Sequence, residues 1–302
     1  MPIFREFAPA KINLTLEVLG KRADGFHELA SLVAFARDAG DDVTLDTSRP
    51  TGSSVVGPFG ATIAGKNLID VTLGKLAAAD AGLVLGHVTL TKNLPVAAGI
   101  GGGSADAAAV LRAVRRANPD RAERIDWQSI ALSLGADVPV CLFSQSAIMG
   151  GIGEIVVPAC SLSPLAVVLV NPRVPVPADK TAQVFRRLNA RPLPADFVRQ
   201  LWSPFFESPG GFRRYMAERP NALESAAMEV VPEIAAIKQA LLATPRVMVS
   251  GVSGGGPTCF AVYESLTDAQ SAGDHISARY PSWWVAASRV VRNASDVTAY
   301  IS

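Results

Sequence analysis

The sequence is poor in cysteine and histidine, with three of each in 302 residues. Cys141, Cys160 and Cys259 lie far apart and form no C-x-x-C pair. This spacing argues against a disulfide framework or a cysteine-ligated zinc site, and an odd, scattered set of thiols fits a reducing cytoplasm. Three histidines are likewise too few for a histidine-rich metal site.

Long apolar runs and an excess of one charge are also missing. The apolar run over residues 165–170 has the length of a strand, and residues 1–6 lack the hydrophobic stretch of a signal peptide. Lysine plus arginine number 28 and aspartate plus glutamate 27, which gives no support to a nucleic-acid or membrane-surface role. We therefore expect no nucleic-acid or membrane partner, and a cytoplasmic protein. We also expect a monomer or weak homodimer, which no feature of the sequence decides.

The composition is that of a chain with a substantial core, since 49% of residues are hydrophobic and 18% are charged. Its 302 residues exceed the usual size of one domain. Prolines at positions 158 and 164 mark the best boundary, which gives domains of residues 1–160 and 161–302. The hydrophobic spacing predicts strands at 29–35, 43–45, 87–92 and 165–170, and helices at 67–81, 104–117, 126–134, 180–188 and 222–242.

The most informative segment is residues 95–104, a loop between the strand expected at 87–92 and the helix expected at 104–117. Four of its glycines fall within five positions, and their missing Cβ atoms allow an anion to reach backbone N–H groups. The helix start adds free N–H donors and the positive end of the helix dipole. Ser104 can cap that helix or offer its hydroxyl to a phosphate or a magnesium ion. The alternative is a plain flexible turn.

Two common phosphate-binding patterns are absent from this loop. No G-x-x-x-x-G-K-[ST] sequence occurs, and the sixth position counted from Gly99 is Ser104 and from Gly101 is Asp106, so G-x-G-x-x-G is absent too. The segment 95–109 instead resembles the phosphate-binding motif of the GHMP kinases, the superfamily of galactokinase, homoserine kinase and mevalonate kinase.

Further motifs support this resemblance, in order along the chain. They cover residues 8–14, 24–29, 67–69, 134–139, 151–154, 221–224 and 253–260. Three positions depart from the family's usual residue: Phe26 stands where tyrosine is common, Ala222 where aspartate is, and Gly255 where serine is. The long glycine motif and the segment 24–29 are most similar to the branch that phosphorylates the 2-hydroxyl of a cytidyl diphosphate of methylerythritol, in non-mevalonate isoprenoid biosynthesis.

The resemblance implies an α+β fold of two domains with the active site in the cleft between them. It implies that Asp137 is the general base for the attacking hydroxyl and that Lys11 is its charged partner. From the residues alone, Lys11 could be an ordinary solvated strand lysine and Asp137 an Asx-turn aspartate.

The same resemblance implies the binding residues. ATP would lie in the N-terminal domain against Asn67, Lys92, Pro95, Ala97, Ala98, Gly99, Gly101, Gly102, Gly103 and Ser104. The cytidyl diphosphate substrate would lie towards the C-terminal domain against Asn13, Phe26, His27 and Thr181. Phe26 can stack on a base as tyrosine does but cannot donate an O–H bond. Mg²⁺ is implied by the reaction, with Ser104 as its candidate ligand.

Three alternatives remain open at this point. Residues 251–255 match G-x-S-x-G, so a serine hydrolase using Ser253 is possible in principle, although a strand rather than a helix is expected to follow. A homoserine or mevalonate type of GHMP kinase is a closer alternative, against which the segment 24–27 argues. A non-catalytic nucleotide-binding relative is the third, and the presence of both Lys11 and Asp137 argues against it.

Overall fold

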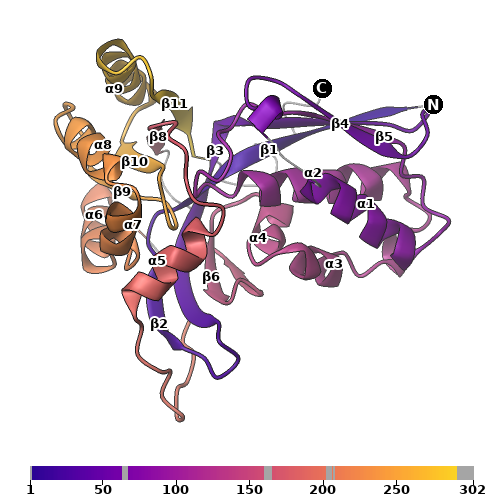
Figure 1. Ribbon diagram of the computed structural model, residues 1–302, viewed down its shortest axis with the longest axis horizontal. Coiled ribbons are helices and arrows are strands. Elements are labelled where there is room, and N and C mark those ends of the chain that lie inside the picture. Colours follow the sequence, from indigo (N-terminus) through magenta and orange to yellow (C-terminus); the bar gives the residue numbers. More distant parts are fainter. Residues whose placement is uncertain (1, 63–66, 160–164, 202–205, 207, 291–302) are drawn as a thin grey trace.

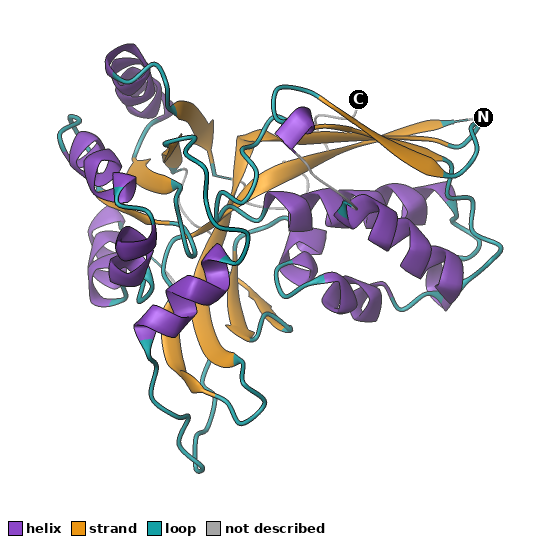
Figure 2. Cartoon of the chain, in the orientation of Figure 1, coloured by secondary structure: helices purple, strands orange, loops and turns teal. Residues whose placement is uncertain are grey.

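The structure is a computed structural model that describes residues 2–62, 67–159, 165–201, 206 and 208–290. Its strands form one larger and one smaller β-sheet, and the helices divide between them. Figure 1 shows most helices of the N-terminal half beneath the larger sheet and most helices of the C-terminal half beside the smaller one. Figure 2 gives the same view by secondary structure.

A single long strand, β3 (His27–Asp46), organises the larger sheet. The other strands of this sheet are β1 (Ile3–Asn13), β2 (Glu17–Lys21), β4 (Gly52–Val56), β5 (His87–Thr91), β6 (Ala147–Gly151) and β7 (Ile155–Pro158). The order is β4-β5-β3-β6-β7, and β1 and β2 also pair with β3. The N-terminal half of β3 pairs with β2 and β6, and its C-terminal end pairs with β5. The strand β6, which lies far along the sequence, thus pairs directly with β3.

Helices of the N-terminal half cover one face of this sheet. They are α1 (Leu68–Ala79), α2 (Gly102–Ala117), α3 (Trp127–Leu134) and α4 (Val138–Phe143). Two of these helices, α1 and α3, have side-chain N-caps. The Asn67 side chain accepts a hydrogen bond from the Asp70 N–H, and the Asp126 side chain accepts one from the Ser129 N–H, each at 2.9 Å. The alanine-rich α2 buries Leu111 and most of its inner face in the core under β1 and β3.

The smaller sheet is antiparallel throughout. Its order is β11 (Trp284–Arg289), β8 (Ala166–Asn171), β10 (Cys259–Tyr263) and β9 (Val249–Val252). Around it lie α6 (Pro209–Glu218), α7 (Glu224–Val230), α8 (Glu233–Leu242) and α9 (Leu266–Arg279). The remaining C-terminal helix, α5 (Lys180–Leu188), packs against α7. Every residue of β8 is buried, which explains why the sequence shows an unbroken apolar run there.

The two sheets share a core. Val167 and Leu169 of β8 pack in one cluster with Ile12 of β1 and Leu32 of β3. Alternate residues of β8 face the other way, into a cluster with the C-terminal helices.

The predicted α+β class is confirmed. The predicted boundary between residues 160 and 161 lies outside the described residues, so that division of the chain stays a prediction, although β7 ends at Pro158 and β8 begins at Ala166.

Some predicted element bounds were wrong. The strands expected at 29–35 and 43–45 are parts of the one strand β3. The helix expected over 222–242 is broken into α7 and α8 at Pro232, whose ring cannot continue the preceding helix. The short helix α4 was not predicted, and Pro139 lies in its first turn, where a missing N–H costs nothing. The part of the chain that the structure describes contains no helix long and apolar enough to cross a membrane.

Burial on α2 leads to a stability prediction. Leu111 is fully buried, so Leu111→Ala should lower the free energy of unfolding by about 2–5 kcal/mol. Leu132 on α3 is 39% exposed, and Leu132→Ala should cost less than about 1 kcal/mol. Urea denaturation of both variants measures the difference. Equal losses would contradict the proposed packing of α2 as the centre of the N-terminal core.

Candidate active site

The glycine loop leads from β5 into α2, as the sequence predicts, but the helix begins earlier. Gly101 occupies the N-cap position with a left-handed φ of 62°, and α2 starts at Gly102. Ser104 therefore lies in the first turn and does not cap the helix. Glycine adopts this left-handed conformation without the steric cost that a side chain adds. The first N–H groups of α2 are left free of side-chain caps, which suits an anion.

The loop is wedged between β1 and the turn that joins β9 to β10. The Lys11 N–H donates to the Ile100 carbonyl at 2.9 Å, and the Ser253 hydroxyl donates to the Gly99 carbonyl at 2.9 Å. A Cβ atom on Gly99 would stand 2.5 Å from the Gly256 carbonyl oxygen, so this approach requires glycine. Residues from both halves of the chain thus fix the shape of the loop.

The position of Ser253 does not fit a hydrolase nucleophile. Its side chain is fully buried, and its hydroxyl accepts from the Asn13 N–H at 3.1 Å while donating to Gly99. The turn that carries it joins two antiparallel strands, whereas a nucleophile elbow leads from a strand into a helix. His275, the only histidine downstream of Ser253, lies on α9 in the wall of a separate cavity. Ser253 is therefore a structural contact of the glycine loop.

A cavity of about 360 Å³ opens over the glycine loop. All ten residues predicted to bind ATP line it: Asn67, Lys92, Pro95, Ala97, Ala98, Gly99, Gly101, Gly102, Gly103 and Ser104. Leu68, Ile69, Leu90, Val96 and Asp106 also contribute. The structure thus brings the predicted set together in one place.

A buried charge cluster lies under the start of α2. The Lys92 ammonium donates to Asp41 at 2.5 Å and to Asp106 at 2.6 Å. Burial alone would lower the pKa of Lys92, but the two carboxylates raise it above its ordinary value. Burial and the nearby charge of Asp41 raise the pKa of Asp106 to about 8 despite Lys92. Asp41 also accepts from the N–H groups of residues 93 and 94, which fixes the entry of the chain into the glycine loop.

Lys11 and Asp137, far apart in the sequence, form an ion pair of 2.8 Å. The Lys11 side chain is 4% exposed, whereas that of Asp137 is 32% exposed, so the carboxyl group opens toward solvent. Asp137 holds the N-cap position of α4, but its side chain makes no capping bond. It is therefore not the Asx-turn aspartate that the local sequence allowed. The carboxyl group keeps one oxygen against Lys11 and can offer the other to a ligand.

A second cavity, of about 700 Å³, contains three of the four residues predicted to bind substrate: Phe26, His27 and Thr181. His27 stacks on Phe185 with ring centroids 4.7 Å apart. Burial, and secondarily the charge of Lys21, lowers the pKa of His27 below its ordinary value. Asn13, the fourth predicted residue, is buried instead, and its side chain donates to the Ser31 hydroxyl at 2.8 Å.

The ion pair lies between the two cavities. Gly101 lines the first cavity, and a Cβ atom on it would approach Lys11 Cβ to 3.1 Å. Ala136, which precedes Asp137, lines the second cavity. The first cavity therefore adjoins Lys11, and the second adjoins the residue before Asp137.

Sequence reasoning missed two residues of this region. Phe185 follows Thr181 by four positions on α5, and that spacing puts both side chains on one face of the helix, which could have indicated it. Lys180 opens α5 and is buried, with its ammonium donating to the Ala97 carbonyl at 3.0 Å and to the Gly256 carbonyl. Burial lowers the pKa of Lys180 to about 8. No local pattern in the sequence marks Lys180.

Known proteins share both the sequence pattern and the fold. The family description "GHMP kinases N terminal domain" matches residues 67–145, and "GHMP kinases C terminal" matches residues 204–282. A 4-diphosphocytidyl-2-C-methyl-D-erythritol kinase from Dinoroseobacter shibae is 43% identical over 93% of this chain and 92% of its own. One of the same name from Azorhizobium caulinodans is 44% identical over 92% of this chain and 96% of its own.

Solved structures agree with these matches. A crystal structure of 4-(cytidine 5'-diphospho)-2C-methyl-D-erythritol kinase has a TM-score of 0.73 and 29% identity, covering 95% of this chain and 99% of that one. A homoserine kinase from Cytophaga hutchinsonii has a TM-score of 0.69 at 18% identity, over 97% and 96% of the two chains, which shows the shared fold alone. The chain belongs to the GHMP kinases, and within them to the family of the 4-diphosphocytidyl-2-C-methyl-D-erythritol kinases. The predicted small-molecule kinase class is confirmed, and ATP is the phosphoryl donor that the family implies.

The geometry of Gly101 predicts the effect of adding one methyl group. Gly101→Ala places a Cβ at a left-handed φ and 3.1 Å from Lys11 Cβ, so affinity for a non-hydrolysable ATP analogue should fall by about tenfold or more. Gly74→Ala on α1 is the matched control, because its Cβ meets nothing within 4 Å and should stabilise the helix by up to about 1 kcal/mol. Calorimetric titration tests both variants. Wild-type affinity in Gly101→Ala would contradict the described loop geometry.

The lowered pKa of Lys180 predicts a pH dependence of stability. The folded-state pKa of about 8 lies below the ordinary value of 10.5, so the buried ammonium costs stability below pH 8, and this cost disappears as the pH rises to 10.5. Relative to Lys180→Met, the wild type should therefore gain on the order of 2 kcal/mol between these pH values. Urea denaturation at pH 7.5 and 10 measures the gain. A difference that is independent of pH would show that Lys180 titrates normally.

Proposed function

We propose that this protein transfers the γ-phosphoryl group of ATP to the 2-hydroxyl of 4-diphosphocytidyl-2-C-methyl-D-erythritol, giving the 2-phosphate and ADP. The observation that carries the proposal is the Lys11–Asp137 pair between the glycine-loop cavity and the cavity with Phe26 and His27. The names of the relatives supply the substrate. The reaction belongs to isoprenoid precursor biosynthesis.

ATP is proposed to bind in the cavity over the glycine loop. The first N–H groups of α2 and the positive end of its dipole would face the phosphates. Asn67, at the start of α1, and Lys92 line the same cavity and are proposed to lie toward the adenine. Because Lys92 already donates to two buried aspartates, its position is fixed before the nucleotide arrives.

Mg²⁺ remains part of the proposal. The described residues include no group of three or more His, Cys, Asp or Glu side chains that could hold a metal ion. This suits magnesium in a kinase, which is held largely by phosphate oxygens and water with few protein ligands. The Ser104 hydroxyl, in the first turn of α2 beside the cavity, is the proposed ligand. When bound, the ion neutralises charge on the phosphates.

The cytidyl end of the substrate is proposed to enter the second cavity. Phe26 is 59% exposed there and offers a ring face for stacking, as does Phe185 near its partner His27. His27 is proposed to hydrogen-bond the base, and Thr181 to contact the substrate nearer the reacting end. For Asn13 the proposed role is indirect, because its N–H and side chain hold Ser253 and Ser31.

At the reacting centre, the oxygen of the substrate's 2-hydroxyl attacks the γ-phosphorus of ATP, and Asp137 takes the proton of that hydroxyl. The bond between the γ-phosphorus and the bridging oxygen breaks, and this oxygen leaves with ADP. The Asp137 side chain is partly exposed, and the oxygen that does not contact Lys11 is proposed to receive the proton of the hydroxyl. The Lys11 ammonium balances the carboxylate before the transfer and stabilises charge on the phosphoryl group during it. Positioning and electrostatics supply most of the acceleration in this chemistry.

The other sequence-based alternatives have less support. A homoserine kinase and a mevalonate kinase of known structure share the fold at identities of 18% and 12%, and similarity at that level does not identify the substrate of this chain. A non-catalytic role leaves the Lys11–Asp137 pair without a purpose. A cytoplasmic location and a monomeric or weakly homodimeric state stay predictions.

The direct test is ADP release from MgATP with the cytidyl substrate, homoserine or mevalonate as acceptor. We expect turnover with the cytidyl substrate alone, reduced by about 10²–10⁴-fold in Asp137→Asn because the proton acceptor is lost. Asp126→Asn, which changes the N-cap aspartate of α3, is the matched control and should retain near wild-type turnover.

Each outcome bears on a separate part of the proposal. Turnover with another alcohol would keep the kinase and replace the substrate. Equal loss in the Asp137 and Asp126 variants would show that the effect comes from stability and not from a missing base.

A further inference from the structure

The turn between β2 and β3 presents Phe26 and His27 to the second cavity, and local hydrogen bonds shape it. The Arg22 N–H donates to the Phe26 carbonyl at 2.8 Å, and the Phe26 N–H donates to the Asp24 carboxylate at 3.1 Å. Gly25 has a left-handed φ of 88°, which the tight turn requires. The Arg22 and Asp24 side chains also form an exposed ion pair at 2.9 Å, and exposed ion pairs contribute little to stability. Holding the turn in one place requires a contact to a buried side chain.

Glu28, the second residue of β3, is that anchor. Its side chain is 1% exposed, and its two carboxylate oxygens accept from different arginines. Arg22 donates to one oxygen at 3.1 Å, and the Arg199 Nε donates to the other. The bond from Arg199, and next the bond from Arg22, holds the pKa of Glu28 below its ordinary value in spite of burial. A buried carboxylate is stable only with such partners.

Arg199 reaches Glu28 from a remote segment, residues 191–199, which follows α5. This segment lies along the free edge of β2, where the Lys21 N–H donates to the Arg191 carbonyl and the Leu193 N–H donates to the Lys21 carbonyl, each at 2.8 Å. A Cβ on Gly20 would come within 2.7 Å of Leu193 Cα, so the close approach depends on glycine. We call residues 191–199 the brace.

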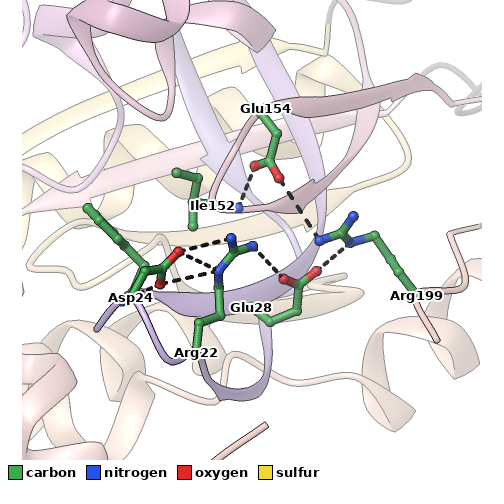
Figure 3. A network of polar contacts seen from close by, with 7 residues as sticks. Arg22, Asp24, Glu28, Ile152, Glu154 and Arg199 are labelled. Atoms are coloured by element: carbon green, nitrogen blue, oxygen red, sulfur yellow. Dashed lines mark hydrogen bonds and ion pairs between the residues drawn. The ribbon is translucent and has the colours of Figure 1, made fainter. Parts of the chain in front are cut away.

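The same arginine also reaches the turn between β6 and β7. Figure 3 shows Arg199 between Glu28 and Glu154. Arg199 Nη2 lies 4.0 Å from Glu154 Oε1, and Glu154 Oε2 accepts from the Ile152 N–H at 2.6 Å. Ile152 lines the second cavity beside Phe26 and His27. One guanidinium therefore connects two turns that both contribute to the wall of the second cavity.

A ligand-binding role for these arginines has less support than a positioning role. Arg22, Asp24, Glu28 and Arg199 line a separate cavity of about 570 Å³. Two positive and two negative side chains leave no net charge to attract an anion. Neither arginine lines the second cavity. The charges satisfy one another, and their effect is to fix the backbone.

We propose that Arg199 and Glu28 are positioning residues for recognition of the cytidyl diphosphate substrate, with the brace holding the Phe26–His27 turn and the Ile152 turn at a fixed separation. This inference rests on the proposed function for its substrate. Neither residue touches the substrate, and neither affects the glycine-loop cavity. Loss of the link should therefore weaken substrate binding and leave ATP binding intact.

The test compares Arg199→Met, Glu28→Gln, their double variant and Arg199→Lys. Arg199→Met should raise the KM for the cytidyl substrate about tenfold, with the KM for ATP changed less than about twofold. The double variant should be no worse than the poorer single variant, because both remove one link. Arg199→Lys should recover part of the loss. Arg121→Met removes an arginine that pairs with Asp80 at 2.7 Å, away from both cavities, and controls for general loss of stability.

Hydrogen exchange gives a readout that does not need turnover. Amides of residues 22–29 and 151–154 should exchange faster in Arg199→Met and not in Arg121→Met. Unchanged exchange at these residues would overturn the proposed positioning role of the brace, even if the KM for the cytidyl substrate rises. Losses that add in the double variant would overturn it too, because they would indicate that Arg199 contacts the substrate directly. Suppose that exchange at these residues is faster in Arg199→Met but the wild type does not phosphorylate the cytidyl substrate. That result would support the positioning role of the brace and refute only the proposed function.

Discussion

The ion pair between Lys11 and Asp137 is the interaction on which the arrangement of the site depends. A buried ammonium needs a compensating charge, and the N-cap of α4 delivers it across 126 residues of sequence. Lys11 can reach Asp137 only because β1 runs directly beneath the glycine loop, where Gly101 has no side chain to intervene. The ion pair therefore forms only when the sheet, the glycine loop and α4 are all in their observed positions. Positioning the reacting groups in this way is where most of the catalytic effect in phosphoryl transfer arises.

The glycine loop is also the place where the two halves of the chain meet. Gly99 packs against the carbonyl oxygens of the β9–β10 turn, and the Ser253 hydroxyl closes the contact. Lys180 adds a third link, from the start of α5 to the carbonyls of Ala97 and Gly256. Since α5 also carries Thr181 into the second cavity, one helix lines that cavity and holds the loop that lines the first. Changes at this helix are expected to affect both substrates.

Local chemistry made much of this predictable from the sequence. The glycine loop and the caps at Asn67 and Asp126 are encoded within a few residues, and family resemblance located Asp137. Features that depend on distant partners were out of reach. Hydrophobic spacing could not reveal that Pro232 divides one long helical pattern, although the proline itself was a signal. The link from Glu28 to Arg199 spans 171 residues. The motif over residues 24–29 includes Glu28 but does not indicate its partner, and no local pattern marks Arg199.

A crystal structure with the cytidyl substrate and a non-hydrolysable ATP analogue tests the central claim most directly. We predict the triphosphate against the first turn of α2, and the 2-hydroxyl oxygen within about 3 Å of the Asp137 carboxyl group and facing the γ-phosphorus. The cytosine should lie beside Phe26. A 2-hydroxyl that contacts another base, with Asp137 paired only to Lys11, would contradict the account.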